Sequence, residues 1–141
     1  MDQKTSIKVT SEKLDLQDCT SFVEDESCGG IVTFIGTVRN ATENRTVTLL
    51  DFSGYETMAV KEMQKIADKA LQKFPIYKIA IHHAVGKLKI GEIPVIIAVS
   101  SAHRKASFEA CEFAIDTLKE TVPIWKKEHF EDGEVWVNSH P

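Results

Sequence analysis

Five cationic side chains at the ends of predicted strands and helices are the residues best suited to chemistry in this 141-residue chain. Arg39 follows a strand-like segment, and His103 and Arg104 stand where another such segment leads into a helix. Lys119 lies in the last turn of that helix, and Lys126 lies in the strand after it. A helix N-terminus beside a His-Arg pair is a natural phosphate site, because free N–H groups and the helix dipole add to the side-chain charge. The alternative is a set of solvated surface charges, with Lys119 complementing a helix C-terminus.

The two lysines suggest a further role. Lys126 shares a strand face with Ile124, whereas Trp125 and Lys127 share the other face, so only one of the adjacent lysines can face a given pocket. If Lys119 and Lys126 converge, each ammonium group raises the cost of charging the other, and a lysine pKa falls toward neutrality. A neutral amine can act as a base or nucleophile.

Histidine and cysteine side chains are weaker candidates. His82 and His83 are adjacent on a predicted strand, so they point to opposite faces and cannot chelate one metal together. Cys19, Cys28 and Cys111 contain no CxxC pair, which favours reduced thiols in a cytoplasmic protein over a zinc ribbon or a disulfide framework. Cys111 lies on the apolar side of a predicted helix and is interpreted as a core residue.

Apolar periodicity predicts the elements that must position these groups. Two long helices are expected over residues 56–74 and 105–121, and a short helix around 14–23. The segment 29–38 has the composition of a buried strand, and 39–45 is expected to be a mobile loop. Further strands are predicted over residues 6–10, 47–52, 77–85, 93–101, 124–128 and 134–137. This order predicts an α+β fold, with the two long helices on one face of a mixed or mainly antiparallel sheet.

Length and composition are those of one globular domain over residues 1–141, with a loose N-terminal segment at 1–12. The net charge of −4 argues against bulk nucleic-acid binding. The polar start of the chain shows no secretory signal, and no apolar run is long enough to span a membrane.

Four stretches of the chain form a distinctive set: GGIVTFIGTVRN (29–40), LLDFSGYETMA (49–59), AVSSAHRKASFEACEFAIDTLKETVPIWKKE (98–128) and GEVWV (133–137). In their order and spacing they resemble the large, catalytic subunit of molybdopterin synthase. The most specific feature is SSAHR followed, at the observed spacing, by LK and PIWKKE.

The resemblance implies an α/β-hammerhead fold and a sulfur-transfer reaction. Cyclic pyranopterin monophosphate (precursor Z) would become molybdopterin by gaining two sulfur atoms from the C-terminal Gly-Gly thiocarboxylate of a small ubiquitin-like subunit. The large subunits would form a dimer within a heterotetramer, and neither a metal nor another cofactor is implied.

The resemblance also implies residue roles. Lys119 and Lys126 correspond to catalytic lysines, and His103 and Arg104 are expected to reach the site across the dimer. The implied substrate-binding residues are Thr37, Val38, Arg39, His103, Arg104, Lys127 and Glu128.

The chain departs from the family pattern at several positions. Ala84 stands where the family usually has Arg, and Ser53 and Gly54 replace Glu and Ala. Two other functions remain open at this point: a module that binds an anion or a ubiquitin-like tail without turnover, and a transferase that uses the same cations to hold phosphate.

Overall fold

The computed structural model describes residues 3–138, and the side chains of residues 3–133. The described residues form nine strands and three helices. The strands are β1 (Thr5–Thr10), β2 (Gly30–Gly36), β3 (Ala41–Thr42), β4 (Arg45–Gly54), β5 (Lys78–Ala84), β6 (Gly86–Lys89), β7 (Val95–Ser101), β8 (Ile124–Phe130) and β9 (Gly133–Asn138). The helices are α1 (Leu16–Val23), α2 (Glu56–Lys73) and α3 (Arg104–Thr121).

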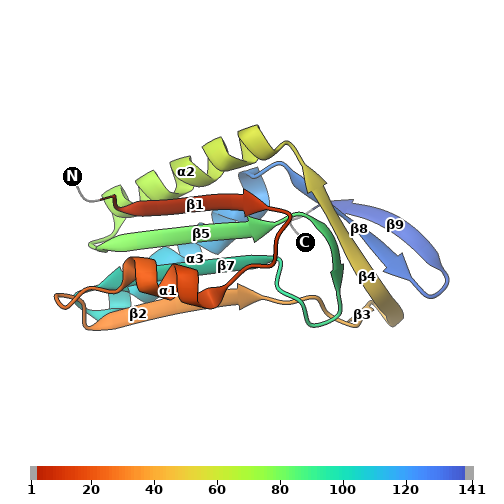
Figure 1. Cartoon of the computed structure of the whole chain (residues 1–141), viewed down its shortest axis with the longest axis horizontal. Coiled ribbons are helices and arrows are strands. Elements are labelled where there is room, and N and C mark those ends of the chain that lie inside the picture. Colours follow the sequence, from red (N-terminus) through yellow and green to blue (C-terminus); the bar gives the residue numbers. More distant parts are fainter. Residues whose placement is uncertain (1–2, 139–141) are drawn as a thin grey trace.

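Four strands form the first sheet, in the order β1-β5-β7-β2 (Figure 1). β1 is parallel to β5, whereas β7 is antiparallel to both β5 and β2, so the sheet is mixed. Within the N-terminal segment expected to be loose, residues Thr5–Thr10 therefore form an edge strand. β2 forms the opposite edge, and Ile31 and Thr33 are exposed, which corrects the prediction that this strand is buried.

The helices cover both faces of this sheet. α2 and α3 contact each other and cover one face, where Ile81 and Ile97 belong to the main apolar core. α1 covers the other face, where Ala80 and Ala98 pack with Cys19 in a smaller core. The division follows from the alternation of side chains along each strand. The prediction of an α+β fold with both long helices on one face is confirmed.

The second sheet is antiparallel and lies beside the carboxyl end of β5 (Figure 1). Its order is β3-β4-β8-β9, and β6 also pairs with β4. The expected loop at 39–45 is instead partly a hairpin, in which Glu43 and Asn44 have positive φ values of 47° and 67°. These angles are those of a two-residue type I′ turn.

β6 is not predicted from the sequence either, because it lies between the strands expected over residues 77–85 and 93–101. None of the described helices is both long and apolar enough to cross a membrane.

Candidate functional site

A cavity of about 480 Å³ lies where the first sheet meets the second. The ends of β2, β5 and β7, the middle of β4, the last turns of α3 and the start of β8 form its wall. The lining residues are Phe34, Ile35, Gly36, Thr37, Arg39, Leu50, Phe52, His83, Pro94, Val95, Ile115, Leu118, Lys119 and Lys126. The structure therefore gathers Thr37, Arg39, Lys119 and Lys126, which are far apart in sequence, around one hollow.

Lys119 reaches the cavity because of the way α3 is packed. Ile115 and Leu118 are buried in the main core and fix the rotation of the helix about its axis. Lys119 follows Leu118 in the last turn, where it is half-buried and lines the cavity. The helix then ends at Thr121, before Pro123.

The alternation of side chains along β8 directs Lys126 toward the cavity. Ile124 is 1% exposed and Glu128 4% exposed, whereas Trp125 is 43% exposed. Lys126 therefore shares the inward face with Ile124 and Glu128, and its neighbour across the ladder to β4 is Phe52, another cavity residue. This confirms the predicted division of the strand into two faces.

The environment of Lys126 lowers its pKa below the ordinary lysine value. Burial is the largest cause, and the positive charges of Arg39 and Lys119 act in the same direction. The carboxylate of Glu128, whose Oε1 lies 3.8 Å from the Lys126 Nζ, partly opposes the shift. Three cations thus share the cavity, and one of them is held closer to losing its proton.

Val38 and Lys127 are not among the residues lining the cavity. The Val38 side chain is 3% exposed, its N–H donates to the Glu92 carbonyl at 3.0 Å, and its own carbonyl accepts from the Gly91 N–H at 3.0 Å. This backbone pairing anchors the segment that carries Thr37 and Arg39. Glu128 also does not line the cavity and bears on it through Lys126.

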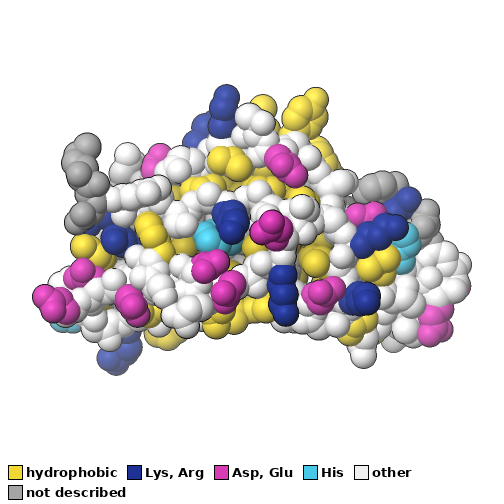
Figure 2. Space-filling view, viewed as in Figure 1, with side chains coloured by type: hydrophobic (Ala, Val, Ile, Leu, Met, Phe, Trp, Pro, Cys, Tyr) yellow, Lys and Arg dark blue, Asp and Glu magenta, His cyan; other side chains and the backbone are white. Residues whose placement is uncertain are grey.

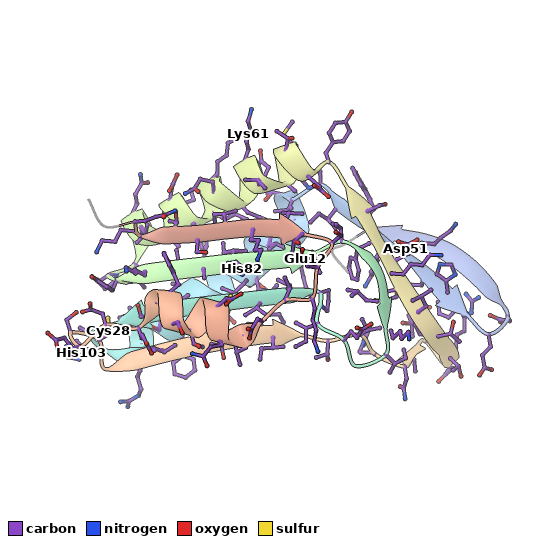
Figure 3. The ribbon with its side chains drawn as sticks, in the orientation of Figure 1. Glu12, Cys28, Asp51, Lys61, His82 and His103 are labelled. Carbon is purple, nitrogen blue, oxygen red and sulfur yellow. The ribbon has the colours of Figure 1, made fainter. Side chains whose placement is uncertain are left out.

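His103 and Arg104 lie elsewhere on the same chain. They line a separate depression of about 320 Å³ at the N-terminal end of α3. Figure 3 places His103 at one end of the molecule and Asp51, the cross-strand neighbour of Lys127, near the other. Arg104 is the first residue of α3 and Lys119 lies in its last turn, and 15 residues at 1.5 Å each separate them by roughly 22 Å along the helix axis.

Charges of both signs are intermingled on the face shown in Figure 2. On that face, Lys and Arg side chains alternate with Asp and Glu side chains without forming a broad basic surface. The cavity thus gathers three cationic side chains in a chain whose net charge is −4.

His83 is a cavity residue that the sequence reasoning did not select. It is 3% exposed, and its ring packs edge-on against Phe52 with centroids 5.5 Å apart. Alternation along β5 gave the signal that His82 and His83 face opposite ways, and the structure confirms it. His82 contacts Ser6 and Cys19, on the α1 side of the sheet. The alternation could not show which of the two histidines lines a cavity, because that depends on where the second sheet packs.

Comparisons with known proteins agree in sequence and in fold. Residues 9–121 match a family model described as MoaE protein. Molybdopterin synthase catalytic subunit 1 of Aedes aegypti is 46% identical over 129 residues, which are 91% of this chain and 83% of that protein. The crystal structure of molybdopterin synthase from Staphylococcus aureus superposes with a TM-score of 0.88 at 39% identity, covering 92% of this chain and 94% of that one.

A more distant structure shows the same fold. It is a complex of subunits 1 and 2 of molybdopterin-converting factor from Helicobacter pylori, with a TM-score of 0.74 at 23% identity, covering 99% of this chain and 94% of that chain.

Proposed function

This chain belongs to the MoaE protein family, and from that premise we propose that it is the catalytic subunit of a molybdopterin synthase. Its substrate is precursor Z, and its product is molybdopterin. The sulfur comes from the C-terminal thiocarboxylate of a small ubiquitin-like subunit, whose extended tail enters the cavity. The observation that carries the proposal is the convergence of Arg39, Lys119 and Lys126 on one hollow of about 480 Å³.

The cations suit each stage of this chemistry. A cyclic phosphate and a thiocarboxylate are both anions, and Arg39 can hold an anion through two parallel N–H donors. Attack of sulfur on the pterin side chain develops negative charge, which Lys119 and Lys126 stabilise at short range in a partly desolvated cavity. Lys126 is also suited to proton transfer, because its environment lowers its pKa.

His103 and Arg104 complete the proposed site from a second copy of the chain. They are too far along α3 to reach the cavity of their own copy, and both are exposed. Ile31 and Phe108, on β2 and α3, are also exposed and give this end of the molecule apolar surface. We assign this end to a homodimer contact within a heterotetramer that carries two small subunits, and we place the reaction in the cytoplasm.

The proposal is tested by assaying product formation with precursor Z and the thiocarboxylated small subunit. Replacing Lys119 with Ala is expected to lower turnover by at least roughly 100-fold, since a charge that stabilises the transition state is lost. Binding of the small subunit, measured by calorimetry, should change little.

Lys69→Ala is the matched control, because Lys69 is exposed on α2 and lies outside the cavity. Unchanged turnover in Lys119→Ala would refute the catalytic assignment. A wild-type chain that binds the small subunit but makes no product would instead be a binding module.

A further inference from the structure

The polar wall of the cavity is rich in hydrogen-bond donors and poor in acceptors. Arg39, Lys119 and Lys126 offer N–H groups and, when charged, have no acceptor atom. Among the described side chains that line the cavity, only those of Thr37 and His83 can accept a hydrogen bond. Thr37 is exposed, whereas His83 is buried. Among the described lining residues, His83 is therefore the one enclosed side-chain acceptor.

A backbone contact fixes which nitrogen of His83 is the acceptor. Nδ1 lies 2.7 Å from the carbonyl oxygen of Ala84, and a carbonyl oxygen only accepts hydrogen bonds. Nδ1 therefore carries the proton, and Nε2 of the neutral ring carries the lone pair. Nε2 forms no hydrogen bond within the described residues, and it is not one of the fully enclosed side-chain atoms that lack a partner, so it keeps some accessible surface although the residue as a whole is 3% exposed.

The ring is held in place and kept neutral. Its edge-on contact with Phe52, at an interplanar angle of 70°, restricts its rotation. Burial lowers the pKa of His83 to about 4, so the imidazole is uncharged at neutral pH despite its bond to the Ala84 carbonyl. An uncharged acceptor also avoids adding a further positive charge to a wall that already holds three cations.

We propose that His83 is a specificity-determining residue of this site, whose Nε2 accepts a hydrogen bond from an N–H group of the substrate heterocycle. This inference rests on the proposed function and extends it. The cations select the anionic groups of the ligand, and His83 selects a ring that offers a donor. A ligand of similar size and charge without such a donor would cover Nε2 and leave it unpaired, which is unfavourable.

Two substitutions separate the two ring nitrogens. In His83→Asn, the amide N–H₂ can still donate to the Ala84 carbonyl, but no acceptor remains at the position of Nε2. In His83→Gln, the longer side chain places an amide oxygen near the position of Nε2 and gives up the donor to Ala84. His82→Asn is the matched control, because His82 is a buried neighbour that faces α1 and does not line the cavity.

The test measures KM and kcat for precursor Z in the complete complex with the thiocarboxylated small subunit. We expect His83→Asn to raise KM roughly 10-fold with kcat changed less than about 3-fold, and His83→Gln to keep KM within about 3-fold of wild type. His82→Asn should leave KM unchanged, whatever its effect on the melting temperature.

Two results would overturn the proposal. One is a wild-type KM in His83→Asn. The other is an equal rise of KM in both His83 variants, which would give the residue a role in folding alone. The same variants can be compared without turnover, by calorimetric measurement of the binding of precursor Z to the complex with an unmodified small subunit. If the wild-type complex made no product, the proposed function would be rejected, and the binding experiment would still decide the role of His83.

Discussion

Lys126 lies between groups that act on its charge in opposite directions. Burial, Arg39 and Lys119 favour the neutral amine, and Glu128 favours the ammonium. Because Glu128 is 4% exposed, its carboxylate acts across a poorly solvated space. A residue that does not line the cavity therefore partly offsets the effect of burial, which is the largest influence on the protonation of the proposed catalytic lysine.

We predict that Glu128→Gln lowers the Lys126 pKa further, because the substitution removes the carboxylate that raises it. NMR titration of the full chain with labelled lysine side chains would measure the change. Glu112→Gln, an exposed α3 position outside the cavity, is the control. An unchanged or raised Lys126 pKa would contradict the assignment of Glu128 as its partner.

At the scale of residues, sequence reasoning selected the cavity cations and missed His83. Position at the ends of strands and helices made Arg39, Lys119 and Lys126 candidates, whereas the choice of a site over solvated surface charges came from the family resemblance. His83 depends on where the second sheet packs, and the pattern of β5 alone does not contain that information. The family resemblance of the chain implied no role for His83 either.

Most elements followed from local pattern, and the two missing strands did not. β3 has only two residues, and β6 has only four, which are Gly86, Lys87, Leu88 and Lys89. Neither has enough apolar residues to show a period of two. Both strands exist because β4, with ten residues, offers hydrogen-bonding edges to three partners.

The close approach of β4 to the start of β8 gives a prediction at the scale of elements. A Cβ atom on Gly54 would lie 2.4 Å from the Pro123 carbonyl oxygen and 3.0 Å from the Ile124 Cα. Gly54→Ala must therefore shift the backbone that leads to Lys126. We expect the free energy of unfolding to fall by about 1–3 kcal/mol, measured by urea denaturation, and KM for precursor Z to rise.

Ser53→Ala is the control for this substitution, because Ser53 is the exposed neighbour on β4. Equal stability of Gly54→Ala and Ser53→Ala would show that the contact between Gly54 and Pro123 is not restrictive. The position also bears on the family comparison, since Gly54 is one of the places where the chain departs from the expected pattern.

At the scale of the whole molecule, the separation of Arg104 from Lys119 distinguishes a site shared by two copies from a site within one chain. In a shared site, a hybrid of Arg104→Ala and Lys119→Ala subunits contains one intact cavity and one doubly altered cavity. Random exchange of equal amounts makes half of the dimers hybrid, so we predict recovery of about a quarter of wild-type turnover.

The experiment requires proof that subunits exchange, for example by mass spectrometry of differently labelled chains. Each variant alone should remain close to inactive. Absence of recovery after proven exchange would place all the required groups within one chain and would remove His103 and Arg104 from the proposed site.

The length of α3 acquires a meaning beyond stability if each copy serves two cavities. The helix has 18 residues, with Arg104 at its first position and Lys119 in its last turn. Loss of one turn would bring Arg104 and Lys119 closer together by about 5.4 Å. The same deletion would therefore displace the cationic groups of both active sites of the dimer relative to one another. Natural variation in chain length should therefore spare this helix.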